Sequence, residues 1–136
     1  MAAKVLDSWA LVAYFEDEPA AGAVENLLHQ AMLEKHRLFL SVVNWGEVYY
    51  NTMREVSQEA AEARVREIAS LPIDIVGVGD DLAIVRQAAI YKATKKMSYA
   101  DCLGAALAKI KNAEFVTGDP EFKEVEKEIK INWLTK

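Results

Sequence analysis

Four acidic residues in this sequence have the types and positions that a divalent cation site requires. Asp7 and Asp119 each follow a short apolar run, whereas Glu47 and Asp101 lie near the starts of helical segments. Carboxylate oxygens are preferred ligands of Mg²⁺, and few are needed because the ion keeps several waters. A cation held in this way can polarise a phosphate and help to form hydroxide from water. Such chemistry needs no histidine, cysteine or serine nucleophile.

Each of the four acids also has a structural explanation. Asp7 and Asp119 could cap the helices that follow them, and a proline follows Asp119 at the first helical position. Ser98 and Asp101 have the spacing of a capping box, and Glu47 alone could be a solvated helix residue. The set of four is harder to explain as caps, because each acid is expected at the same end of a separate strand–helix unit.

Strands and helices alternate along the chain, as judged from apolar runs, helical spacing and capping signals. This alternation implies parallel strands joined by right-handed crossovers, and the near-continuous apolar strands imply helices on both faces. We therefore expect an α/β fold, a three-layer α/β/α sandwich whose ligands bind at the carboxyl ends of the strands. The predicted strands are residues 4–6, 38–42, 73–78, 115–117 and 131–134. The predicted helices are residues 9–15, 20–34, 44–54, 57–69, 80–94 and 99–111, with a short helix that begins at Pro120.

The length of 136 residues and the ordinary composition predict a single domain over residues 1–136. The net charge of −5 argues against simple sequence-independent binding to nucleic acid, although carboxylates gathered around a cation can still face a phosphate. The chain has no leader-like start and no apolar run near the roughly 20 residues that span a bilayer. We therefore expect a cytoplasmic protein that does not contact the membrane, with its single cysteine, Cys102, in the core.

Other polar and apolar features favour structural interpretations. Lys92, Lys95 and Lys96 could neutralise an RNA backbone, but lysines near a helix end are more often solvated and complement the helix dipole. His29 and His36 belong to no acidic motif and are interpreted as surface residues. Five apolar residues of the first two helices could line a partner groove or form a buried helix–helix seam: Tyr14, Phe15, Leu27, Leu28 and Met32.

Four short segments around these acids resemble the acidic motifs of PIN-domain proteins: residues 5–8, 44–48, 98–102 and 115–119. Their order and spacing, and the chain length, are similar to those of stand-alone VapC-type toxin ribonucleases. The resemblance covers essentially the whole chain. It implies a five-stranded parallel sheet in the order 3-2-1-4-5, a Mg²⁺ or Mn²⁺ site, and cleavage of RNA. It also implies a homodimer and an antitoxin protein that occupies the site.

The resemblance also assigns roles by motif position. The principal metal ligands and catalytic acids would be Asp7, Glu47 and Asp101. Asp119 would be the more variable fourth acid, which often acts through water. The polar positions that support these carboxylates correspond to Ser8, Asn44 and Thr117. Trp9 departs from the pattern, because the family more often has a smaller residue there, and this residue affects the shape of the groove.

The leading hypothesis is therefore a metal-dependent endoribonuclease, the toxin of a type II toxin–antitoxin pair. A second hypothesis is a PIN-like scaffold that binds RNA or a protein without cutting. A third is a phosphoryl-transfer domain of the receiver or haloacid-phosphatase type. The phosphatase pattern requires a second aspartate at position 9, where this chain has Trp9, and the receiver pattern requires paired acids at the first strand, where Asp7 stands alone.

Overall fold

Five parallel strands form one sheet in the order β3-β2-β1-β4-β5, which confirms the predicted topology. The computed structural model describes residues 2–80 and 82–135. The strands are β1 (Ala2–Leu6), β2 (His36–Ser41), β3 (Ile73–Val76), β4 (Glu114–Thr117) and β5 (Ile131–Trp133). The helices are α1 (Ser8–Phe15), α2 (Ala21–Met32), α3 (Val42–Glu55), α4 (Gln58–Ser70), α5 (Ala83–Thr94) and α6 (Tyr99–Ile110), and η1 (Pro120–Val125) is a short 3₁₀ helix.

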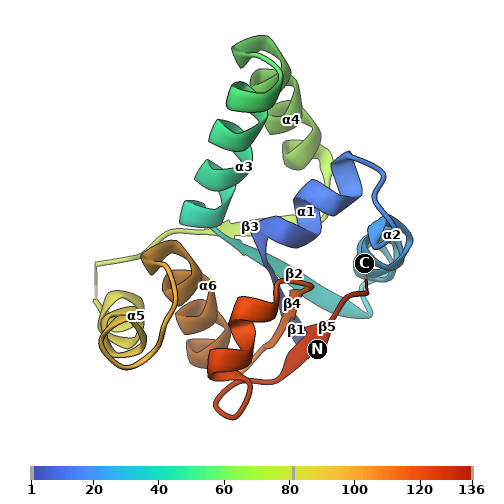
Figure 1. Ribbon diagram of the computed structural model, residues 1–136. Coiled ribbons are helices and arrows are strands. Elements are labelled where there is room, and N and C mark those ends of the chain that lie inside the picture. The colour runs from blue at the N-terminus through green and yellow to red at the C-terminus, as the bar shows by residue number, and fades with distance from the viewer. Residues whose placement is uncertain (1, 81, 136) are drawn as a thin grey trace.

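Helices cover both faces of the sheet, so the predicted three-layer arrangement is confirmed (Figure 1). Successive strand residues point to opposite faces. Val5 and Phe115 pack with residues of α5, α6 and η1. Leu6 and Val116 pack on the other face with residues of α1 and α2. Both faces are therefore apolar, which explains why the strands read as continuous hydrophobic runs.

Helices α3 and α4 lie side by side and project away from the end of the sheet (Figure 1). The prediction that residue 42 ends a strand and that the helix begins at residue 44 is wrong. The Ser41 side chain accepts a hydrogen bond from the Val43 backbone N–H at 3.3 Å, so the helix begins at Val42. Val42 and Val43 look like strand residues because they are β-branched, but the Ser41 cap places both of them in the helix. At α4 the predicted cap is confirmed: Ser57 Oγ accepts from the Ala60 N–H at 3.0 Å.

The segment between β3 and α5 also differs from the prediction. Strand β3 ends at Val76 rather than at residue 78. Helix α5 begins at Ala83 rather than at residue 80, because Leu82 has a left-handed φ of 62°, which a helix interior does not allow. Residue 81 of the predicted helix lies outside the described residues. This difference lies outside the four acidic motifs.

Buried side chains hold the two helical layers on the sheet. The rings of Phe115 and Phe122 are fully buried, with centroids 4.6 Å apart, and join β4 to η1. Complete burial of such a side chain contributes about 1.5–3 kcal/mol. Cys102 is buried in the same cluster, as predicted. Within residues 2–80 and 82–135, no helix has both the length and the apolar character needed to cross a membrane.

His36 is a correction to the sequence analysis. We expected a surface residue, but His36 is 7% exposed, and its Nε2 lies 3.0 Å from the Leu27 carbonyl oxygen. It is the first residue of β2, and the contact ties that strand to α2. The ring is buried because a backbone carbonyl supplies a polar partner. His29 is exposed, as expected.

Candidate metal and active site

Asp7 lies at the centre of the site, at the junction of β1 and α1. Its backbone N–H donates to the Val116 carbonyl at 3.0 Å, which fixes it beside the end of β4. Its side chain does not cap α1, so the capping explanation is wrong for this residue. Instead Oδ2 accepts a hydrogen bond from Thr117 Oγ1 at 2.8 Å. Asp7 is only 2% exposed, and its Oδ1 is buried without a hydrogen-bond partner among the described residues.

Glu47 is held over the same end of the sheet by two donors. Its Oε1 accepts from Ser8 Oγ at 3.1 Å and from Asn44 Nδ2 at 2.7 Å. Asn44 is fully buried, one turn earlier on α3, and its Oδ1 has no hydrogen-bond partner within residues 2–80 and 82–135. The contacts of Ser8 and Asn44 with Glu47, and of Thr117 with Asp7, are those that a supporting role requires.

A glycine allows α6 to approach α3 at this point. A Cβ at Gly104 would lie 2.8 Å from Asn44 Oδ1 and 3.3 Å from Phe115 Cε1. A larger residue would force the side chain of Asn44, or the helix itself, to shift. The close approach places the first turn of α6, and with it Asp101, near the acids of β1 and α3.

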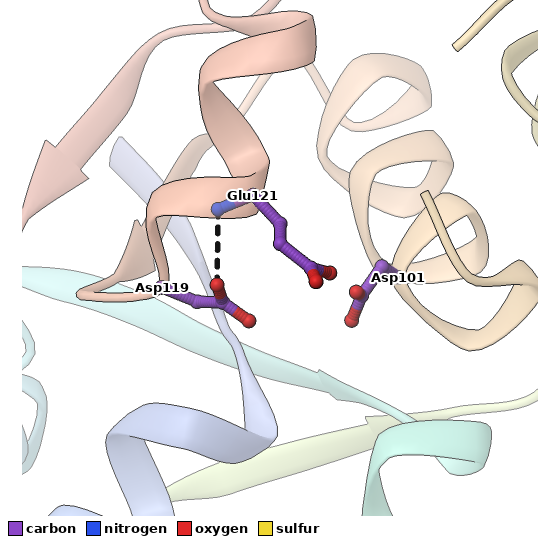
Figure 2. Close-up of side chains that lie close together, drawn as sticks. All are labelled: Asp101, Asp119 and Glu121. Atoms are coloured by element: carbon purple, nitrogen blue, oxygen red, sulfur yellow. Dashed lines mark hydrogen bonds between the residues drawn. The ribbon is translucent and has the colours of Figure 1, made fainter. Parts of the chain in front are cut away.

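Asp101 and Asp119 combine a capping position with a place in the site. Ser98 Oγ accepts from the Asp101 backbone N–H at 3.1 Å, so the predicted N-cap of α6 is present, while the Asp101 side chain is 9% exposed. Asp119 caps η1 as predicted, since its Oδ1 accepts from the Glu121 N–H at 3.0 Å (Figure 2). The Asp119 N–H donates to Thr117 Oγ1 at 3.0 Å. The Thr117 hydroxyl therefore links Asp7 to Asp119.

Glu121 is a site residue that the sequence analysis missed. Oxygens of Asp101, Asp119 and Glu121 all lie within 4.8 Å of one another, a group that could hold a metal ion (Figure 2). Asp7 and Glu47 are not members of this tight group among the described residues. The available signal was the spacing of Asp119 and Glu121 around Pro120, because Asp119 caps the short helix and Glu121 lies in its first turn.

The four predicted acids line one cleft of about 400 Å³. Ser8 and Trp9 of α1 line it as well, as does Glu121. The structure thus brings the four side chains together as expected. Their metal-binding and catalytic roles stay predictions. The further lining residues are Val12, Glu16, Glu18, Asn51 and Ser98.

Burial and mutual repulsion make two of the acids hold their protons. Burial raises the pKa of Asp7 from 3.8 to about 8; the Thr117 hydrogen bond opposes the rise, and the charges of Asp101, Glu47 and Asp119 add to it. Burial also raises the pKa of Asp101 to about 7; its hydrogen bond with Ser98 opposes this rise, and the charges of Glu47, Asp119 and Glu121 add to it. Without a cation, the cleft therefore holds protons near neutral pH.

These residues fit a hard divalent cation. The side chains that line the cleft include no lysine, arginine or histidine in the described parts of the chain, so no protein group neutralises the carboxylates there. The unpartnered, buried Asp7 Oδ1 is a carboxylate oxygen that lacks a hydrogen-bond donor. An all-oxygen donor set of this charge suits Mg²⁺ or Mn²⁺. The Lys92 amino group, in contrast, donates to the Met97 carbonyl at 3.0 Å, and the Lys95 amino group lies 3.2 Å from Glu128.

The apolar residues of α1 and α2 form partly a buried helix–helix seam and partly an open groove. Leu28 is 5% exposed and belongs to the buried cluster, with Leu27, Tyr14 and Phe15 partly buried against it. Met32 is 67% exposed. A groove of about 400 Å³ contains Tyr14, Leu28 and Met32 among its lining residues. The seam is therefore present, and its outer edge is open.

Comparison with known proteins places this architecture in a family. Residues 4–128 match the PIN domain. No curated protein matches. Among solved structures, VapBC2 from Rickettsia felis bound to a promoter DNA fragment has 15% identity and a TM-score of 0.74, over 98% of this chain and 99% of that chain. VapBC-1 from nontypeable Haemophilus influenzae has 17% identity and a TM-score of 0.73, over 98% and 99%.

A third similar structure is VapC20 from Mycobacterium tuberculosis, described as a toxin that cleaves the sarcin–ricin loop. It has 16% identity and a TM-score of 0.69, over 88% of this chain and 92% of that chain. At such identities, these likenesses show the fold. The match of the domain itself, over most of the sequence, shows the family. The chain belongs to the PIN-domain family.

Proposed function

We propose that this protein is a metal-dependent endoribonuclease that hydrolyses RNA phosphodiester bonds as the toxin of a type II toxin–antitoxin pair. The observation that carries the proposal is the Asp7 carboxyl, which is buried at the centre of an acidic cleft. Among residues 2–80 and 82–135, one of its oxygens has no hydrogen-bond partner and no cationic side chain lines the cleft. Buried like charges destabilise a fold unless a counter-charge compensates them. A scaffold that binds without cutting would have no use for such a group.

The protein's own residues would prepare the site for the reaction. Asp7, Glu47 and Asp101 would hold Mg²⁺, or Mn²⁺ in its place, with Glu121 beside Asp101. Asp119 would position the attacking water through its free oxygen, because its other oxygen caps η1. When bound, the divalent cation supplies charge stabilisation for the phosphate and lowers the pKa of water. Thr117, Ser8 and Asn44 fix the carboxylates in place through the hydrogen bonds described above.

The decisive experiment compares RNA cleavage by the purified protein in Mg²⁺ and in chelator. Asp7→Asn and Asp101→Asn should each lower the cleavage rate by at least about 100-fold, as do changes in comparable electrostatic groups. Asp17→Asn is a matched control, since Asp17 is exposed and does not line the cleft. Equal cleavage by the parent and both site variants would contradict the proposal. Absence of any Mg²⁺-dependent change in thermal stability would favour the non-cleaving scaffold.

The partners belong to the same proposal. We propose one domain over residues 1–136 that acts in the cytoplasm as a homodimer and is silenced by a cognate antitoxin. The similar structures from Rickettsia felis and Haemophilus influenzae are those of VapBC2 and VapBC-1. The open groove beside Met32 offers an apolar surface for a partner helix. Co-purification with the product of an adjacent small gene, and light scattering of the purified protein, test these two assemblies. A monomer that no neighbouring gene product inhibits would contradict this part.

A further inference from the structure

Trp9 lines the acidic cleft, yet the proposed cation chemistry does not use it. It lies in the first turn of α1, directly after Ser8. A Cβ at Gly118 would lie 2.6 Å from both Cζ2 and Cζ3 of the indole, so only glycine allows the ring so close. The outer edge of the half-buried ring therefore rests against the loop that joins β4 to η1 and carries Asp119. This close approach to Gly118 limits the movement of the indole.

A second cavity adjoins the cleft at this residue. It measures about 210 Å³ and is lined by Trp9, Glu18, Pro19 and Ala20. Trp9 and Glu18 line both cavities. The residues that line the smaller one are one aromatic residue, one proline, one alanine and one glutamate. Its volume lies below the roughly 300–1,000 Å³ of sites for drug-sized ligands, which suits one planar ring rather than a whole nucleotide.

We propose that Trp9, Pro19 and Glu18 form a nucleobase subsite beside the cation site, where one base of the RNA stacks on the indole and guanine is preferred. This proposal rests on the proposed nuclease function. Stacking on an aromatic side chain holds any base, since every base has a π-face. The preference comes from Glu18, because a carboxylate only accepts hydrogen bonds. The Watson–Crick edge of guanine presents two adjacent donors, N1–H and the N2 amino group, which match the two carboxylate oxygens.

The charges on this side of the cleft favour a base over a phosphate. Glu16 and Glu18 both line the cleft near Trp9. Their negative charges repel a phosphate group but not an uncharged base. The RNA backbone would therefore lie toward the cation, and the base would turn toward the indole. Such an arrangement would fix the register of the scissile bond relative to one base.

A binding experiment tests the subsite separately from catalysis. Trp45→Phe and Trp133→Phe leave Trp9 as the sole tryptophan, and Asp101→Asn stops cleavage under the proposed function. The probes are short uridine oligoribonucleotides that contain one guanosine, one inosine in its place, or no purine. Trp9 fluorescence reports stacking, and the anisotropy of a dye on the RNA reports binding in the presence of Mg²⁺. Inosine lacks the N2 amino group, so it tests the contact with Glu18 alone.

We expect the guanosine probe to quench Trp9 fluorescence and to bind about 10-fold more tightly than the inosine probe, as the loss of one charge-assisted hydrogen bond predicts. Glu18→Gln should abolish that difference. Trp9→Leu keeps an apolar side chain but removes the π-face, and should weaken binding by about 5- to 150-fold. Trp9→Phe should retain most of the affinity. The contrast between leucine and phenylalanine separates stacking from packing, and the probe comparison needs no substitution at position 9.

Several results would overturn the subsite. RNA that binds by anisotropy without quenching Trp9, equal affinities for the guanosine and inosine probes, or equal affinities of the Trp9→Leu and Trp9→Phe variants would each do so. These failures differ from a failure of the nuclease proposal. That proposal fails if the parent protein does not cleave RNA in Mg²⁺, even where guanosine quenches Trp9. It stands if the parent cleaves RNA while the probes are not distinguished.

Discussion

Replacing Asp7 with asparagine should stabilise the metal-free protein, and by an amount that depends on pH. The amide oxygen of asparagine can keep the hydrogen bond from Thr117 Oγ1, which is 2.8 Å long in the parent. The amide nitrogen takes the place of the unpartnered oxygen and faces the other carboxylates of the cleft. The substitution therefore replaces a buried carboxyl, whose ionisation is costly in the folded state, with a neutral group of the same size. Where the native contacts of an aspartate stabilise its charged form, substitution with asparagine would instead destabilise the fold.

The magnitude follows from the raised pKa of Asp7. A carboxyl whose pKa is higher in the folded state than in the unfolded state stabilises the fold below its unfolded pKa, and this contribution is lost as the pH rises through the folded value. For Asp7 the window runs from 3.8 to about 8. At pH 7 about 3 of these pH units have been crossed, at 1.36 kcal/mol each, or about 4 kcal/mol in total. Asparagine does not titrate, so position 7 of the Asp7→Asn variant does not lower the free energy of unfolding as the pH rises.

The assay is urea unfolding in chelator, followed by circular dichroism at several pH values. The free energy of unfolding of Asp7→Asn should exceed that of the parent by about 1–2 kcal/mol at pH 5 and by about 4 kcal/mol at pH 7. The exposed control Asp17→Asn should stay within about 0.5 kcal/mol of the parent across the range. Excess Mg²⁺, at about 100 times its Kd, should raise the free energy of unfolding of the parent by about 2.7 kcal/mol. It should raise that of Asp7→Asn much less.

The pH dependence makes this prediction refutable. If Asp7→Asn is less stable than the parent at pH 7 without metal, burial does not penalise ionisation of the Asp7 carboxyl, and the prediction is wrong. A gain that is the same at pH 5 and pH 7 would show that it comes from packing. Mg²⁺ that stabilises the variant as much as the parent would remove Asp7 from the proposed metal site.

Three further perturbations test the supporting parts of the site. Gly104→Ala should destabilise the protein by about 1–3 kcal/mol in thermal unfolding, because the new Cβ would come 2.8 Å from a buried amide oxygen of α3. The helical control Gly22→Ala meets nothing within 4 Å and should stabilise it by up to about 1 kcal/mol; equal effects would contradict the close approach of α6. Glu121→Gln should weaken Mn²⁺ binding in calorimetry by at least about 5-fold through the loss of a nearby charge, whereas the exposed Glu126→Gln should not; unchanged affinity excludes this carboxylate as a ligand. Thr117→Val should destabilise the protein by about 2 kcal/mol in urea unfolding, because the Asp7 carboxyl loses its donor and the Asp119 N–H loses its acceptor. Unchanged stability would show that the Thr117 hydroxyl supports neither group.

Local patterns in the sequence predict most of the secondary structure and identify the four candidate acids. Apolar runs marked the strands, and serine caps marked the starts of α4 and α6, because such signals are local in the chain. The parallel sheet then followed from the alternation of elements. Its strand order was implied by the resemblance to the PIN-domain family. The errors lay at boundaries, such as Val42, where β-branched residues begin a helix because Ser41 caps it.

The way in which these residues meet depends on how the segments pack. Residues 7, 101 and 119 are distant in the chain, and their proximity depends on the pairing of β1 with β4 and on the approach of α6 through Gly104. Burial is likewise a property of the assembled layers, so the unpartnered oxygen of Asp7 has no signature in the sequence. The same is true of the indole of Trp9 against Gly118 and of the buried ring of His36. Local patterns encode the conformation of each segment, whereas solvent exposure and charge repulsion arise only when the segments pack together.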